Sequence, residues 1–290
     1  MYICKEPLIR NTCHILDICG VSNLVSCFLL QCDTIRPEEL RMGKIIAIGG
    51  GEIGSPGYPV ETTLIDKEII RISGIRKPRL LFLPTAANDS ESYVETVHKH
   101  FGENLGCVVE ILYLIKEKPG NKEIQNKVLN SNIVYVGGGN TLKMLRVWRS
   151  FGLDKLLLDA YRKGIVLSGV SAGAICWFKY GSSDSRRFAN PSAGLIKIKG
   201  LNLFNALCCP HYDIEPDRKP HLKELMGKTP VVALAIDNCC AIEIIDDSYR
   251  IITSKDGPNA YKVYWRKGVF YEEIIKKKEA FSPIAPLLSR

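Results

Sequence analysis

From Met42 onward, short runs of isoleucine, valine and leucine alternate with stretches that have the apolar spacing of a helix. The predicted strands are Lys44–Ile48, Arg79–Leu83, Val108–Leu114, Ile133–Val136 and Ile165–Val170. The predicted helices between them are Thr62–Ile72, Asp89–His100, Lys122–Leu129, Leu142–Trp148 and Leu153–Arg162. Near-continuous apolar runs are typical of strands buried on both faces, and their alternation with helices predicts a parallel sheet between helical layers. The sequence therefore predicts an α/β fold, a three-layer sandwich with a mostly parallel sheet.

The pattern loosens in the second half of the chain. Residues Lys179–Ser192 are polar and carry no core signal, so we predict a loop over a functional site. Three further strands are predicted at Leu207–Cys209, Val231–Ile236 and Cys240–Ile244. The tail from Tyr249 to Tyr271 alternates apolar and polar residues, which predicts C-terminal antiparallel hairpins.

The first 41 residues differ from the rest. They show little periodicity and hold five of the eleven cysteines, and their apolar stretch Val21–Leu30 is too short to span a bilayer. We expect residues 1–41 to be an N-terminal extension that is disordered or not native, with Met42 as the functional start of a domain over residues 42–290. The cysteines lack metal-binding spacing and no targeting segment is recognisable, so we expect reduced thiols, no metal site and a cytoplasmic protein.

The pentapeptide Gly169-Val170-Ser171-Ala172-Gly173 has the form G-x-S-x-G between a predicted strand and a helix start. This is the context of a nucleophile elbow, where a sharp turn exposes the serine hydroxyl and a following helix N-terminus favours developing negative charge. We interpret Ser171 as a nucleophile. The alternative is a small-residue turn of an α/β protein without a catalytic role.

Three glycines, Gly137, Gly138 and Gly139, follow the strand that precedes the Ser171 strand along the chain. Glycines allow backbone N–H groups to turn toward a ligand, and the carboxyl ends of parallel strands meet at one edge of a sheet. We expect an oxyanion hole with one donor from Gly138 or Gly139 and one from the Ala172 N–H. The alternative is a glycine-rich helix start without a ligand.

A nucleophilic serine needs a base, and His211 is the strongest candidate because it follows the apolar strand Leu207–Cys209. His98 and His100 fall on a polar helix face, and His221 falls in a charged helical segment, so we expect these three to be solvated. A structural role for His211 stays open as an alternative.

The base in turn needs an acidic residue that fixes its tautomer. Asp237 ends the apolar strand Val231–Ile236 and is our first choice. Asp184, in the polar loop after Ser171, is the second choice, and it fits the chain order of serine, acid and histidine that is usual among α/β-hydrolases.

The segment Gly49-Gly50-Gly51-Glu52-Ile53-Gly54 matches the dinucleotide pattern G-x-G-x-x-G after the first strand. That pattern requires a helix to open at the glycines, whereas Pro56, Gly57 and Pro59 block one here. We therefore predict a loop that lines the pocket and no nucleotide cofactor.

Five motifs of this sequence together resemble the family of serine peptidases that contains peptidase E (aspartyl dipeptidase) and cyanophycinase. They span about Met42 to Glu243, and residues 1–41 have no counterpart. They are Ile48-Gly49-Gly50-Gly51, Leu83-Pro84-Thr85-Ala86, Val136-Gly137-Gly138-Gly139-Asn140-Thr141, Gly169-Val170-Ser171-Ala172-Gly173-Ala174 and Pro210-His211-Tyr212.

The resemblance implies a flavodoxin-like, glutamine-amidotransferase-like catalytic domain, with Ser171 as nucleophile, His211 as base and no cofactor. It implies a third, acidic member that is commonly glutamate where this chain has Asp237. It also implies a dipeptidase that releases N-terminal aspartate, with an arginine after the histidine binding the aspartate carboxylate. Arg218 is the matching candidate, a helix-surface role being its alternative, and we add Asn140 as a second substrate-binding residue.

The expected ligand is a short peptide, with no nucleic-acid or membrane partner, and the sequence leaves a homodimer open. A net charge of +8 favours anionic substrates. Two alternatives to a peptidase remain: a serine esterase or other acyl hydrolase, and a non-catalytic amidotransferase-like binding protein.

Overall fold

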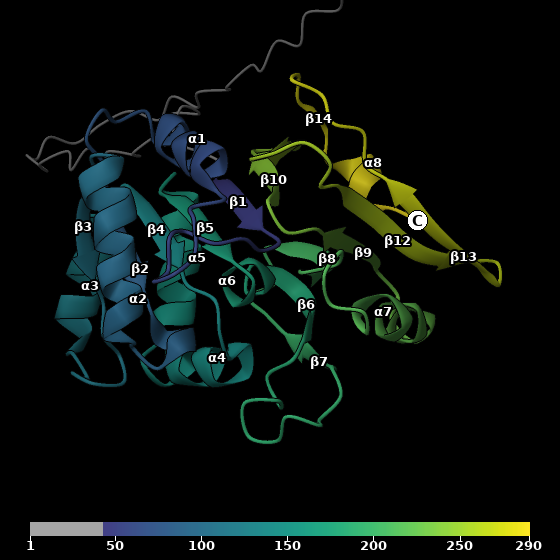
Figure 1. The fold of residues 1–290 in the computed structure, drawn as a ribbon, viewed down its shortest axis with the longest axis horizontal. Helices are drawn as coiled ribbons and strands as arrows, with labels where there is room; N and C mark the ends of the chain where they lie inside the picture. The colour runs from purple at the N-terminus through teal and green to yellow at the C-terminus, as the bar shows by residue number, and fades with distance from the viewer. Residues whose placement is uncertain (1–42) are drawn as a thin grey trace, which may run out of the picture. The chain divides into compact units, whose positions relative to one another are not determined.

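The computed structural model describes residues 43–290, and the predictions for residues 1–41 and for Met42 lie outside the described residues. The helices are α1 (Thr63–Ser73), α2 (Glu91–Val97), α3 (Asn121–Leu129), α4 (Thr141–Ser150), α5 (Leu153–Arg162), α6 (Ala172–Ile175), α7 (Arg218–Gly227) and α8 (Ala285–Leu288). The strands form two sheets (Figure 1).

The first sheet carries the predicted parallel strands. Its order is β14-β11-β10-β1-β5-β4-β2-β3. These strands are β1 (Lys44–Ile48), β2 (Arg79–Leu83), β3 (Val108–Ile111), β4 (Ile133–Val136), β5 (Val166–Val170), β10 (Cys240–Ile245), β11 (Ser248–Thr253) and β14 (Ser282–Pro283). Strands β3-β2-β4-β5 have the 2-1-3-4 order of a flavodoxin-like sheet, and β1 occupies the position of the fifth strand. The flavodoxin-like α/β prediction is confirmed.

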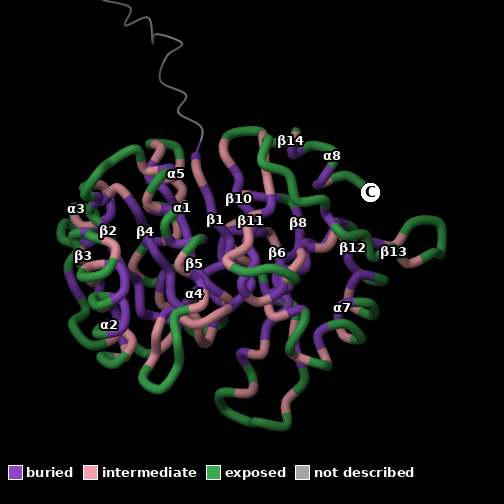
Figure 2. The backbone as a smooth tube through the Cα atoms, turned by 45° about the horizontal axis from the view of Figure 1, so that its top comes forward, coloured by how far each residue is buried: buried purple, intermediate pink, exposed green. Residues whose placement is uncertain are grey.

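Both faces of this parallel sheet are buried. Alternate residues of β1 point to opposite faces: Ile45 and Ala47 pack with α3, α4 and α5, whereas Ile46 and Ile48 pack with α1 and α2. This explains the continuous apolar runs, because a strand with helices on both sides has no solvent-facing positions. Figure 2 shows the same distribution, with buried strands at the centre and exposed loops at the rim.

The second sheet has the order β13-β12-β9-β8-β6-β7. Its strands are β6 (Phe178–Ser183), β7 (Ile196–Lys199), β8 (Phe204–Cys209), β9 (Val232–Ile236), β12 (Ala260–Arg266) and β13 (Val269–Ile274). Helix α7 lies on one of its faces, and its other face shares an apolar core with the first sheet (Figure 1). The C-terminal antiparallel hairpins are confirmed by the pairs β10–β11 and β12–β13.

The prediction of one long loop over Lys179–Ser192 is wrong at its start. Residues up to Ser183 belong to β6, which pairs with β8 and with β7. The sequence of β6 is polar although it forms a strand. Lys179 and Tyr180 are partly exposed, and the buried positions are occupied by the small residues Gly181, Ser182 and Ser183. Strand β7 was not predicted.

The described cysteines, six in number, are free and buried, as expected for reduced thiols. Within residues 43–290 no helix is long and apolar enough to cross a membrane.

Candidate active site

Ser171 lies in the sharp turn between β5 and α6. Its backbone has φ 55° and ψ −106°, and its N–H donates to the Ile48 carbonyl of the neighbouring strand at 3.0 Å. A positive φ is unfavourable for serine, so the surrounding structure holds this residue in a strained conformation. Strain of this kind is the hallmark of a nucleophile elbow. Because α6 has only four residues, its dipole adds little to the site.

The two glycines that flank Ser171 permit this turn. A Cβ on Gly169 would lie 2.7 Å from the carbonyl oxygens of Val136 and Gly173, and a Cβ on Gly173 would overlap the backbone of Val136. Neither position has space for a larger residue. The G-x-S-x-G spacing is thus explained by the close packing of β4, β5 and α6.

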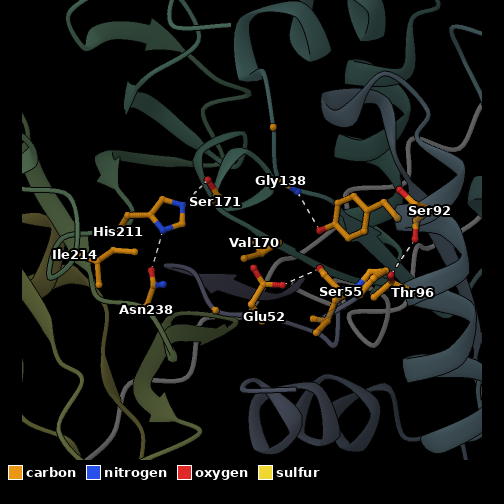
Figure 3. A pocket seen from close by; sticks show the side chains of 15 residues that line it. Glu52, Ser55, Ser92, Thr96, Gly138, Val170, Ser171, His211, Ile214 and Asn238 are labelled. Atoms are coloured by element: carbon orange, nitrogen blue, oxygen red, sulfur yellow. Dashed lines mark hydrogen bonds between the residues drawn. The ribbon is translucent and has the colours of Figure 1, made fainter. Parts of the chain in front are cut away.

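His211 reaches Ser171 from the second sheet. It follows β8, has φ 54°, and its N–H donates to the Gly49 carbonyl at 3.2 Å. Its Nε2 lies 2.8 Å from Ser171 Oγ, and its Nδ1 lies 2.8 Å from Asn238 Oδ1 (Figure 3). An amide oxygen only accepts, so Nδ1 carries the proton and Nε2 accepts from the Ser171 hydroxyl. The imidazole is therefore in the tautomer that a general base requires.

The residue that orients His211 is Asn238 and not the expected Asp237. The Asp237 carboxylate accepts the Asn259 N–H at 2.8 Å and the Tyr261 hydroxyl at 3.5 Å, and it makes no hydrogen bond to His211. Burial raises the pKa of Asp237 above its usual value. Asp237 and Asn238 lie in the turn that follows β9, and this turn directs the amide of Asn238, one position further along the chain, to His211.

The alternative acid, Asp184, also makes no contact with His211. It follows β6, and its carbonyl accepts the Arg187 N–H at 2.7 Å. Neither candidate carboxylate therefore reaches the imidazole, and Asn238 completes the chain of hydrogen bonds from Ser171.

The glycines Gly49, Gly50 and Gly51 explain how two sheets meet at this site. A Cβ on Gly50 would overlap Asn238 Oδ1 and would lie 2.5 Å from His211 Nδ1, so only glycine leaves room for their hydrogen bond. The carbonyl of Gly50 accepts the Cys239 N–H at 2.9 Å. No helix opens here, as predicted, and the segment instead forms part of the pocket wall.

Of the candidate oxyanion donors, Gly138 and Gly139 line the same cavity as Ser171, and Ala172 follows Ser171 in the chain. The Gly138 N–H donates to the Tyr93 hydroxyl at 3.2 Å, so this group is already partnered. Among residues 43–290 no hydrogen bond is made by the N–H of Gly139 or of Ala172. Gly139 has φ 132° and packs against the Ala86 carbonyl without room for a Cβ. Gly139 and Ala172 therefore keep free donors beside Ser171.

Ser171 and His211 open into a cavity of about 450 Å³. The predicted loop after β1 lines it with Glu52, Ile53 and Ser55. Sequence reasoning missed the walls formed by Ser92, Tyr93 and Thr96 of α2 and by Ile214 after β8. Burial raises the pKa of Tyr93 to about 12, and the nearby Glu52 charge adds to this effect. Tyr93 therefore stays protonated, and its hydroxyl oxygen accepts from the Gly138 N–H.

Two expected substrate-binding residues lie elsewhere. Arg218 is 1% exposed, and its guanidinium donates to the Glu215 carboxylate and to the Ser182 carbonyl. Asn140 caps α4, its Oδ1 accepting the Lys143 N–H at 3.0 Å, and its amide donates to the Ser185 carbonyl at 3.1 Å. Neither residue lines the Ser171 cavity, and the 185–193 segment lines a separate hollow beside α4.

The other histidines also lie away from Ser171. His98 is exposed as expected, but the expectation of solvation is wrong for His100, which is buried with Nε2 2.8 Å from Asp66 Oδ2. His221 is half-buried, with Nδ1 3.1 Å from Ser182 Oγ. The sequence could not show the partner of His100, because Asp66 lies on the separate helix α1.

The chain is similar in sequence to several known peptidases. The uncharacterized peptidase YgaJ of Bacillus subtilis is 38% identical over 226 residues, which cover 77% of this chain and 92% of that protein. The uncharacterized peptidase Lmo0363 of Listeria monocytogenes is 31% identical over 172 residues, covering 56% of this chain and 81% of that protein. Peptidase E of a Nostoc species is 24% identical over 200 residues, covering 65% and 78%.

Two crystal structures share the fold. A peptidase from an acI-B1 Actinobacterium superposes with a TM-score of 0.64 at 19% identity, covering 84% of this chain and 98% of that one. A putative peptidase E from Listeria monocytogenes superposes with a TM-score of 0.55 at 23% identity, covering 73% and 98%. Residues 45–252 match Peptidase family S51. With this match over most of its length, the chain belongs to Peptidase family S51 and is a peptidase.

Proposed function

We propose that this peptidase is of the serine type and hydrolyses short peptides through an acyl ester on Ser171. The observation that carries the proposal is the pair of 2.8 Å contacts that join Ser171 Oγ, the His211 imidazole and Asn238 Oδ1. This is the arrangement of nucleophile, base and orienting residue that acyl transfer needs, with an amide in the third position.

The reaction follows from the positions of these groups. His211 Nε2 takes the Ser171 hydroxyl proton as Oγ attacks the peptide carbonyl carbon, and the N–H groups of Gly139 and Ala172 donate to the oxyanion. Collapse of this intermediate breaks the C–N bond, and His211 returns the proton to the leaving amine. Water then attacks the ester with His211 again as base, which releases the acid and restores the serine.

The size of the cavity favours short substrates. A volume of about 450 Å³ lies near the lower end of the 300 to 1,000 Å³ that is common for small-molecule sites. The Gly51–Pro56 segment forms one wall and α2 another, so the reacting carbonyl must enter a confined space. A dipeptide is compatible with this space, whereas a folded protein is not.

The preference for N-terminal aspartate loses its support. That expectation depended on the family resemblance, on the net positive charge and on Arg218, whose guanidinium is bound to Glu215 and Ser182 and does not line the cavity. We therefore propose a dipeptidase or short-peptide peptidase without an acidic preference.

A screen of dipeptides X-Leu over all X, with casein and short-chain acyl esters beside them, tests the proposal. We expect turnover of several dipeptides, none of casein, and loss of turnover in Ser171→Ala. Faster turnover of acyl esters than of every peptide would indicate an esterase. No Ser171-dependent turnover of any substrate would favour a non-catalytic binding protein.

A further inference from the structure

Glu52 is the only residue with a carboxylate among those that line the Ser171 cavity within residues 43–290, and no lysine or arginine lines it. The remaining polar groups there are neutral hydroxyls, amides and the imidazole of His211. Figure 3 shows the Glu52 side chain directed into the cavity, between Asn238 and Ser55. The cavity therefore holds one negative charge, although the protein as a whole carries a net charge of +8.

The position of Glu52 is fixed by its own surroundings. Its Oε2 accepts from the Ser55 hydroxyl at 2.7 Å, its N–H donates to Glu61 Oε2 at 3.2 Å, and its carbonyl accepts the Glu61 N–H at 2.7 Å. A carboxylate held in this way loses little conformational entropy when a ligand binds. Such preorganisation favours a selective contact.

Glu52 has no cationic partner of its own. Among residues 43–290 no lysine, arginine or histidine lies within 4 Å of its carboxylate, whereas the neighbouring Glu61 pairs with Lys255 at 3.2 Å. A carboxylate in a recessed site without a counter-charge favours a bound cation. It also opposes the negative charge that develops on the oxyanion beside Ser171, unless a cation of the substrate neutralises it.

We propose that Glu52 selects peptides whose acyl residue presents an ammonium group to the cavity and disfavours N-terminal aspartate. The inference rests on the proposed function, because it places the acyl residue of a substrate in the Ser171 cavity. The ammonium group has two sources, the α-amino group of the peptide and the side chain of lysine, and matched peptides distinguish them.

The test measures binding to Ser171→Ala protein by calorimetry, so that it does not depend on turnover. Ala-Leu is compared with N-acetyl-Ala-Leu for the α-amino group, and N-acetyl-Lys-Leu with N-acetyl-Met-Leu for the side chain. Asn-Leu and Asp-Leu form a third pair of nearly equal shape. Each pair is measured again with the double variants Ser171→Ala/Glu52→Gln and Ser171→Ala/Glu95→Gln. The second is the control, because Glu95 is an exposed residue of α2 outside the cavity and its substitution removes the same charge.

We expect the cationic peptide of the first or second pair to bind at least about tenfold more tightly than its neutral partner, because a charge-assisted hydrogen bond forms. Asp-Leu should bind less tightly than Asn-Leu. Glu52→Gln should reduce the preference for the cationic peptide and the preference for Asn-Leu to about threefold or less, and Glu95→Gln should leave both preferences unchanged.

Three results would overturn the proposal: no preference in either cationic pair, a preference that survives Glu52→Gln, or no measurable binding of any peptide. An equal loss for both members of each pair in Glu52→Gln would also contradict it, because it would show a role in holding the loop. Failure of the proposed function would be seen in a separate measurement, in which the wild-type protein shows no Ser171-dependent turnover.

Discussion

Ser171 and His211 meet at one cavity but come from two differently built regions. Ser171 follows β5 of the parallel sheet, where a local run of strand, turn and helix places its hydroxyl. His211 and Asn238 follow β8 and β9 in the second sheet, and they reach Ser171 only because Gly50 of the first sheet leaves room for them. One half of the site is therefore set by a short motif, and the other half by contacts between segments far apart in the sequence.

The two regions share one property, which is backbone strain at the residues of the proposed catalytic site. Ser171 and His211 have φ 55° and φ 54°, and Cys239, next to Asn238, has φ 60°. Each costs stability in a residue with a side chain, so the surrounding packing must hold the conformation. The comparison predicts that packing changes on the His211 side alter catalysis without altering the Ser171 turn.

The largest effect should follow from removal of either reacting group. We expect His211→Ala and Ser171→Gly each to lower kcat by about 10³-fold or more. Ser171→Gly should in addition raise the urea midpoint, because glycine accepts φ 55° without strain. Peptide turnover and urea titration of purified variants measure both. A Ser171→Gly protein with more than a tenth of wild-type kcat would contradict the assignment of Ser171.

Gly50→Ala tests the contact between the two regions directly. The new Cβ would overlap the Asn238 amide and crowd His211 Nδ1, so the imidazole must shift from its 2.8 Å contact with Ser171. We expect kcat to fall by about 10²-fold, the cost of misplacing a catalytic group by about 1 Å. Gly120→Ala is the matched control, because a Cβ there meets no atom within 4 Å and φ is −74°. Equal kcat values for the two variants would show that Gly50 has no special role.

Asn238 should give a smaller effect, with a diagnostic pH dependence. Asn238→Ala leaves Nδ1 without its acceptor, and we expect kcat to fall by about tenfold or more. Asn238→Asp should retain activity, but a carboxylate beside the imidazole raises the His211 pKa. Because the base acts only when neutral, the acid limb of the kcat/KM profile should move to higher pH. An unmoved profile in Asn238→Asp would argue against the 2.8 Å contact with His211.

Asp237→Asn should have the smallest effect on catalysis, within about threefold in kcat, because its carboxylate faces Asn259. Its effect should instead appear in stability. Burial raises the pKa of Asp237 in the folded protein, so wild type loses stability as pH rises through that raised pKa. Asp237→Asn has no carboxyl group to ionise at this position, so it does not lose this stability. Its stability relative to wild type should therefore increase between acidic pH and pH 7. Urea titrations at several pH values measure the difference, and a large loss of kcat would restore Asp237 as the orienting residue.

The first sheet was largely predictable, and the reason is physical. Strands β1, β2 and β4 and helix α5 begin and end at the predicted residues. Strands buried on both faces have continuous apolar sequences, and glycines mark the turns between elements. Strand β3 is shorter than predicted because its pairing with β2 ends at Ile111 opposite Phe82. The predictions for Ser171 and His211 used similar signals, a strand end followed by a reactive side chain, and the structure brings these two side chains together.

Strands β6 and β7 of the second sheet, and the part of the cavity wall that α2 forms, were not predictable in this way. Strand β6 mixes exposed and buried positions, so its polar residues resemble a loop. The choice between Asp237 and Asn238 depends on which side of the chain faces His211, and the choice for Arg218 depends on its burial against Glu215. Both are properties of long-range packing. The one available signal was the glycine at position 50, whose lack of a side chain marks a close approach.

The most direct test of the account is covalent labelling with a fluorophosphonate probe, followed by peptide mapping. The probe reports a serine activated by a neighbouring base, independently of substrate choice. The account predicts labelling at Ser171 in wild-type protein, none in Ser171→Gly, and strongly slowed labelling in His211→Ala. Folded wild-type protein that resists the probe, or labelling that survives Ser171→Gly, would contradict the central claim that Ser171 is the nucleophile and His211 its base.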